Sequence, residues 1–128
     1  MPPALLDADI AAFLDAHIDS IPQLEILLLL HEGRATSWTI EQIAARIYVD
    51  PTQVQPLLRG LQSHGLVVGA GEGRVYRYAE AADHHALVDT LARAYRTDLI
   101  GVTRFVHAKA SRSVLEFARA FDLKKDRP

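Results

Sequence analysis

Amide, hydroxyl and guanidinium side chains gather in the stretch from residue 51 to residue 64. Of the five glutamines in the chain, Gln42, Gln53, Gln55 and Gln62 lie between residues 40 and 64. Glutamine forms paired hydrogen bonds with adenine and arginine with guanine, and each good pair gives about 1–3 kcal/mol of discrimination against a wrong base. The chemistry offered here is therefore hydrogen bonding to base edges of duplex DNA, by Thr52, Gln53, Gln55, Arg59, Gln62 and Ser63.

A second group of side chains around this stretch suits contacts with phosphate. Such contacts position a protein on a duplex without reading its sequence. Any one of these side chains, taken alone, is more commonly a solvated surface group, and only their clustering supports the prediction. The candidate anchors are Arg46, Arg59, Arg74 and Arg77, with Ser37 and Thr39 as hydroxyl donors. Gln42 is a further residue predicted to contact DNA.

Two helices must position these groups, and each has a clear start signal. Thr39-Ile40-Glu41-Gln42 is a capping box, in which the Thr hydroxyl and the Gln side chain satisfy backbone N–H groups reciprocally. Asp50 is a second N-cap, and Pro51 follows at the first helical position, where its missing N–H costs nothing. Apolar residues at helical spacing give each helix a buried face: Ile40, Ile43, Ala44 and Ile47, then Val54, Leu57, Leu58 and Leu61.

A β-hairpin is predicted directly after the second helix, which His64-Gly65 closes. Residues 66–68 and 74–78 are rich in β-branched and aromatic side chains, and the five residues 69–73 between them include three glycines. The predicted fold class is mostly α with a small β-hairpin, built on a winged helix-turn-helix core.

Helices are predicted on both sides of this core. The whole of 1–128 forms a single domain, with an N-terminal helix in 1–20, the core in 21–79 and C-terminal dimerisation helices in 83–123. Within these, a capping box at Ser20 opens a helix over 21–31, a long helix spans residues 83 to about 109, and a short one runs from Ser113 to Phe121. Gly101 is expected to bend or interrupt the long helix.

The flanking helices carry more apolar surface than a core of this size needs. Large exposed apolar patches usually mark an interface, and a closed homodimer is the commonest arrangement. The alternative is that these helices wrap their own core. The residues predicted to form the dimer interface are Phe13, Leu91, Tyr95, Leu99, Val102, Val106, Phe117 and Phe121.

Composition limits the remaining classes of function. The absence of cysteine excludes disulfides and thiol chemistry, and the longest apolar run, Ile26 to Leu30, is far too short to cross a membrane. Residues 1–4 show no secretory signal, so we expect a cytoplasmic protein. Residues 1–33 carry six acidic side chains and no Lys or Arg, whereas residues 34–77 carry five Arg and three acidic side chains. The acidic end is therefore expected to face away from phosphate.

Other chemistries find little support. No phosphate-binding glycine motif, nucleophile elbow or paired-carboxylate arrangement is present, so we expect no enzyme and no cofactor. Asp83, His84 and His107 are candidate metal ligands, but surface imidazoles are the commoner explanation and no metal site is predicted. The aromatic residues Trp38, Tyr48, Tyr95 and Phe105 would line a ligand pocket beside the C-terminal helices or, alternatively, belong to the core.

The chain resembles compact bacterial winged-helix regulators of the multiple-antibiotic-resistance-regulator and arsenic-repressor kinds. The resemblance covers residues 21–78 through three phrases, Thr39 to Ala44, Val54 to Leu61 and His64 to Val67. It implies a homodimer whose second motif helices enter successive major grooves while the wings touch the flanking backbone.

We therefore expect a homodimeric regulator that binds double-stranded DNA sequence-specifically. The alternative is a winged-helix protein-protein interaction module without direct DNA binding. Two residues favour the alternative: Pro56 removes a backbone hydrogen bond within the second helix, and Glu72 places a negative charge at the tip of the hairpin. The sequence does not identify an operator, an effector or the direction of regulation.

Overall fold

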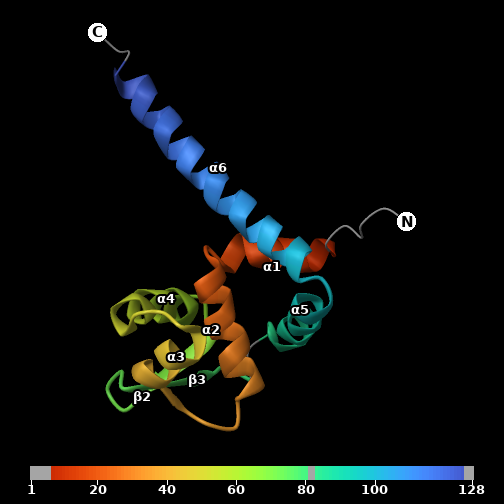
Figure 1. The fold of residues 1–128 in the computed structure, drawn as a ribbon, viewed down its shortest axis with the longest axis vertical. Helices are drawn as coiled ribbons and strands as arrows, with labels where there is room; N and C mark the ends of the chain where they lie inside the picture. Colours follow the sequence, from red (N-terminus) through yellow and green to blue (C-terminus); the bar gives the residue numbers. More distant parts are fainter. Residues whose placement is uncertain (1–6, 81–82, 126–128) are drawn as a thin grey trace.

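The computed structural model describes residues 7–80 and 83–125, without the side chains of residues 113, 114, 116, 117 and 121–125. The chain is mostly helical and has a small antiparallel sheet (Figure 1). In order, the elements are α1 (Ala8–His17), α2 (Ile21–Glu32), β1 (Trp38–Thr39), α3 (Ile40–Ile47), α4 (Pro51–Ser63), β2 (Val67–Ala70), β3 (Val75–Tyr78), α5 (His85–Thr97) and α6 (Leu99–Lys125).

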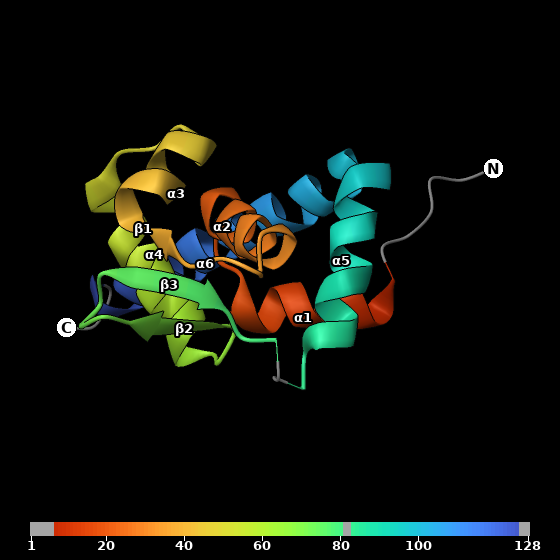
Figure 2. The ribbon, with the colours of Figure 1, turned by 90° about the horizontal axis from the view of Figure 1, so that it is seen from below.

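Helix α2 lies at the centre of the molecule. Apolar residues occupy most of its circumference, which is typical of a helix that is largely covered. Leu24, Ile26, Leu27 and Leu30 are fully buried. Figure 2 shows α3, α4 and the sheet on one side of α2 and α5 on the other, with α1 crossing nearby. Thus α2 contributes to the packing of both halves of the chain.

The predicted starts of α3 and α4 are confirmed. The Thr39 hydroxyl accepts a hydrogen bond from the Gln42 N–H at 3.1 Å, and the Gln42 side chain accepts one from the Thr39 N–H at 2.9 Å. The Asp50 carboxylate accepts from the Thr52 N–H at 2.8 Å. Helix α4 continues through Pro56, which lies exposed on its surface.

The sheet has one strand more than the sequence indicated. Its order is β1-β3-β2, and Trp38 pairs with Tyr76 while Val67 pairs with Tyr78. The short strand β1 ends at Thr39, the cap of α3, so the sheet fixes where α3 begins. The hairpin between β2 and β3 turns through Gly71 and Gly73, both with positive φ as expected, and through Glu72, which also has a φ of 59°.

The prediction of one helix over residues 83–109 followed by a short helix is wrong. The chain breaks at Asp98, between α5 and α6, and α6 then runs without interruption to Lys125. The Asp98 carboxylate accepts a hydrogen bond from the Gly101 N–H at 3.1 Å. A Cβ at residue 101 would collide with that carboxylate, so Gly101 leaves room for this cap instead of breaking the helix itself.

Hydrogen bonds and ion pairs join the first half of α6 to α1 and the two residues after it. Lys109 Nζ donates to the Ile18 carbonyl at 2.8 Å and pairs with Asp19 at 3.0 Å, and Arg112 pairs with Asp15 at 3.4 Å. Beyond this point α6 extends away from the body of the molecule (Figure 1). In residues 7–80 and 83–125, none of the helices is both long and apolar enough to cross a membrane.

The structure corrects half of the predicted dimer interface. Phe13, Leu91, Val102 and Val106 are buried in the chain's own core, where they have no surface to offer a partner. Tyr95 is half-buried and Leu99 is exposed. The side chains of Phe117 and Phe121 lie outside the described part of the chain.

Three histidines meet where α1, α4 and α5 come together. His17 Nδ1 lies 2.7 Å from His64 Nδ1, and the His17 ring lies 4.9 Å from the His84 ring. Burial lowers the pKa of His17, and the nearby His64, His84 and Lys109 lower it further. The folded protein therefore disfavours protonation of His17.

This shift predicts a pH-dependent stability. Between the ordinary histidine pKa of about 6.5 and the lower folded value, the unfolded chain binds more protons, so the free energy of unfolding falls as pH decreases. Denaturant melts of the wild type should show a lower free energy of unfolding as pH decreases below about 6.5. We expect this decrease to be smaller in His17→Gln. His107→Gln, at an exposed histidine of α6, should keep the wild-type slope. An unchanged slope in His17→Gln would contradict the assignment.

Tyr48 occupies the corner between α3 and α4 in a left-handed conformation. Its φ is 60° and its side chain is 93% exposed, so no burial offsets the unfavourable backbone. We expect Tyr48→Gly to raise the free energy of unfolding by about 0.5–1 kcal/mol, measured by urea titration. Tyr48→Val should lower it, because a β-branched residue tolerates this conformation least. Equal stability of the two variants would argue against backbone strain at this corner.

Candidate nucleic-acid interface and the neighbouring groove

The outward face of α4 is polar and is not covered by the described chain. Thr52, Gln53, Gln55, Arg59, Gln62 and Ser63 are all exposed. Their neighbours on the opposite face, Val54, Leu58 and Leu61, are fully buried. The helix therefore presents the predicted ridge of hydrogen-bonding groups to solvent.

Most side chains of this ridge have no hydrogen-bond partner within the described chain. Within the described chain, Gln53, Gln55, Arg59 and Gln62 have no side-chain hydrogen bond or ion pair. The two hydroxyl groups are engaged locally: Thr52 donates to Asp50 at 2.7 Å and Ser63 donates to the Gly60 carbonyl at 2.9 Å.

A close approach holds α4 against α2. Gln23 is only 4% exposed, and its Nε2 donates to the Leu57 carbonyl at 3.3 Å. A Cβ at Gly60 would lie 2.6 Å from that nitrogen, so only glycine allows this contact. The same Gln23 accepts from the Asp19 N–H at 2.8 Å, which ties the start of α2 to the position of α4.

Three of the predicted DNA-binding residues have other roles in the structure. Thr39 and Gln42 form the capping box of α3, which occupies the Gln42 oxygen and leaves only its amide nitrogen. The Arg46 guanidinium lies over the Trp38 ring, 5.5 Å from the ring centroid. Arg46 also lines a groove, described next, rather than continuing the α4 ridge. Arg74 and Arg77 remain exposed, near and on β3.

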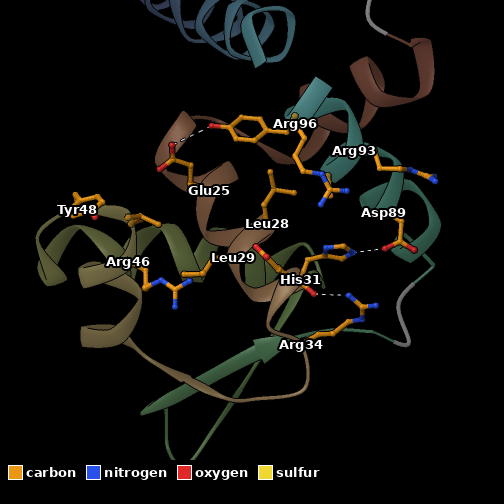
Figure 3. Close-up of a pocket in the computed structure, with 14 residues that line it drawn as sticks. Glu25, Leu28, Leu29, His31, Arg34, Arg46, Tyr48, Asp89, Arg93 and Arg96 are labelled. Atoms are coloured by element: carbon orange, nitrogen blue, oxygen red, sulfur yellow. Dashed lines mark hydrogen bonds and ion pairs between the residues drawn. The ribbon is translucent and has the colours of Figure 1, made fainter. Parts of the chain in front are cut away.

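A groove of about 740 Å³ lies between α2, α3 and α5 (Figure 3). Apolar side chains line part of it, among them Leu28, Leu29 and Ile47. Of the aromatic residues considered for a pocket, Tyr48 and Tyr95 line this groove, but Trp38 and Phe105 do not. Charged groups surround the apolar part: Arg34, Arg46, Arg93, Arg96, Glu25, Glu32 and Asp89.

One end of the groove holds a cluster that the sequence did not predict. His31 Nε2 on α2 donates to Asp89 Oδ1 on α5 at 2.5 Å, and His85 Nε2 lies 3.6 Å from Asp89 Oδ2. The hydrogen bond from His31 lowers the pKa of Asp89, and the nearby His85 and Arg34 lower it further. His85 and Asp89 are four residues apart on one helix, and this spacing was the available signal.

A residue of β3, Tyr78, also contacts the cluster. The Tyr78 hydroxyl on β3 lies 2.9 Å from His85 Nδ1, and burial raises the pKa of Tyr78 to about 12. The metal candidates taken from the sequence lie elsewhere: Asp83 and His107 are exposed, and His84 contacts Phe13 and His17.

Comparisons of the chain with protein-family models, curated proteins and solved structures gave no match. The assignment of a function therefore rests on the geometry of α4, the hairpin and the groove.

Proposed function

We propose that this chain is a cytoplasmic, homodimeric winged helix-turn-helix regulator that binds double-stranded DNA sequence-specifically. In this proposal α3 and α4 form the helix-turn-helix, α4 enters the major groove, and the β2–β3 hairpin is the wing. The observation that carries the proposal is the exposed ridge of α4, in which Gln53, Gln55, Arg59 and Gln62 are unpaired within the described chain. Amide and guanidinium groups of this kind match the donor and acceptor patterns of base edges.

The few positive charges near the ridge leave base contacts as the main source of affinity for DNA in this proposal. Only Arg59, Arg74 and Arg77 lie on α4 and the hairpin, and Asp50 and Glu72 are exposed near them. Phosphate neutralisation supplies most non-specific affinity, so few arginines imply weak binding to arbitrary duplexes. Sequence discrimination then depends on the glutamines and Arg59.

Helix α6 supports the homodimer. Residues 113–125 continue the helix beyond its last described contact with α1, and Figure 1 shows them apart from the rest of the chain. An isolated helix of this length is marginal in water. The stretch also carries apolar residues, of which Leu115 is 62% exposed. A second copy packed along α6 would cover them.

The second candidate is a protein-interaction module built on the same fold. Glu72 supports it, because this exposed carboxylate sits at the tip of the hairpin, where a phosphate-gripping wing would be repelled. Pro56 supports it as well, since it places an apolar ring in the exposed face of α4. Such a surface would suit a protein partner better than a duplex.

DNA binding is tested by selecting a preferred duplex from a random library and measuring affinities for it and for an unrelated duplex. We expect Arg59→Ala to reduce the ratio of the two affinities by about 5- to 100-fold, because it removes a base contact. Arg77→Ala should weaken binding to both duplexes by the same factor. It should also reduce the slope of log affinity against log salt concentration by about one. Arg104→Ala, an exposed arginine of α6, is the matched control.

The two candidate functions give opposite results in this assay. A steep loss of wild-type affinity with rising salt supports the regulator. If the wild-type protein binds no duplex at low salt, the DNA-binding proposal fails and the interaction module is favoured.

The dimer is tested separately by sedimentation velocity. Leu115→Glu places a charge where the second copy is proposed to pack, and we expect the dissociation constant to rise by at least about tenfold. Ala86→Glu, which adds the same charge at an exposed site of α5, should leave the dimer intact. A monomeric wild-type protein at all concentrations would contradict the proposed assembly.

A further inference from the structure

We propose that His31, His85 and Asp89 form a binding site for a divalent transition-metal ion such as Zn²⁺. Each of the three side chains offers one ligand atom, and these atoms all lie within 4.8 Å of one another. Two imidazole nitrogens and a carboxylate oxygen are ligands that Zn²⁺ uses, and three protein ligands leave a fourth position open.

The distances are close to those that a bound ion needs. With bonds of about 2.0–2.2 Å, neighbouring ligand atoms in a tetrahedral site lie roughly 3.3–3.5 Å apart. The 3.6 Å between His85 Nε2 and Asp89 Oδ2 nearly fits this separation already. His31 Nε2 contacts the other carboxylate oxygen, Oδ1, at 2.5 Å, so this pair must separate by roughly 1 Å and the carboxylate must turn to present one oxygen to the ion, which takes the place of the His31 proton. Asp89 is half-buried, so its side chain has room for this change.

Tyr78 orients one of the ligands. Its hydroxyl lies 2.9 Å from His85 Nδ1, and the phenol oxygen can accept a hydrogen bond from the Nδ1–H group. In that tautomer the Nε2 lone pair of His85 points toward Asp89 without a proton. Metal-ligating histidines are held in this way by a partner on their other nitrogen. The Tyr78 hydroxyl therefore supplies the partner that a metal-ligating histidine ordinarily has on its second nitrogen.

The open side of the site faces the groove. His31 and Asp89 line the groove, and Figure 3 shows them opposite one another at its end, with Arg34 and Arg93 nearby. A fourth ligand, water or an anion, would reach the ion from this side. Because the three ligands come from α2 and α5, a bound ion would also join these two helices.

The simpler explanation of the cluster is a structural ion pair between His31 and Asp89. The two explanations differ at His85, because the ion pair does not need it and the metal site does. His85→Gln is therefore the informative variant: it keeps the ion pair and the fold but removes one ligand. His84→Gln, which changes the adjacent histidine outside the cluster, is the matched control.

The test titrates untagged protein with Co²⁺, whose visible d–d absorption reports the ligand geometry, and then displaces it with Zn²⁺. We expect saturation at one ion per chain, and affinities at least about tenfold lower in His85→Gln and Asp89→Asn. His84→Gln should bind as the wild type does. In parallel thermal melts, Zn²⁺ should raise the unfolding temperature of the wild type and of His84→Gln, but not of His85→Gln.

Three results would overturn the proposal. One is the absence of saturable Co²⁺ and Zn²⁺ binding by the wild-type protein. Another is undiminished binding in His85→Gln, which would place the ion elsewhere. The third is an equal loss in His84→Gln and His85→Gln while circular dichroism shows both variants folded. None of these measurements depends on whether the protein binds DNA.

Discussion

The apolar helix α2 is the element on which the rest of the structure depends. Leu24, Ile26, Leu27 and Leu30 are fully buried, and burying each such side chain contributes about 1.5–3 kcal/mol. A helix with apolar residues around most of its circumference needs cover on several sides. Helices α3 and α4 and the sheet pack against one part of it, and α5 and α6 pack against another part (Figure 2). The two halves of the chain therefore share one core.

The polar groups of α2 determine how the neighbouring helices sit on it. Gln23 and His31 are the two buried polar residues among those the structure describes. Gln23 donates to the Leu57 carbonyl of α4, and His31 donates to Asp89 of α5. Apolar packing is non-directional, whereas a buried hydrogen bond is lost when the partners shift. Gln23, near the start of α2, thus fixes α4, which carries the candidate DNA-reading face. His31, near the end of α2, fixes α5, which forms one wall of the groove.

Local chemistry made much of the fold predictable. The capping boxes, Asp50 with Pro51, and the glycines of the hairpin each act within four residues, so the sequence shows both partners side by side. The break at Asp98 also has a local cause, but the signal was misassigned to Gly101. The Asp98 carboxylate caps the start of α6 by accepting a hydrogen bond from the Gly101 N–H. The glycine only leaves room for that carboxylate. Val102 and Val106 were assigned to a dimer interface because periodicity shows which residues are apolar but not what covers them.

Such reasoning reached the groove only through Tyr48 and Tyr95, and it did not reach the histidine cluster. His31 and Asp89 are 58 residues apart, and Tyr78 comes from a third element. Strand β1 was missed because two residues carry too little pattern, and its pairing with β3 is what places Trp38. Arg46 was assigned to phosphate because its type and its position on α3 suited that role. The sequence could not show that Trp38 would lie beneath its guanidinium.

The placement of arginines separates two surfaces of the molecule. Arg34, Arg46, Arg93 and Arg96 line the groove, whereas Arg59 alone lies on the outward face of α4. The two surfaces meet at the corner between α3 and α4, because Tyr48 and Arg46 belong to the groove wall and Asp50 begins α4 only two residues after Tyr48. Tyr48, with its left-handed backbone, is therefore the residue that stands between the groove wall and the start of α4.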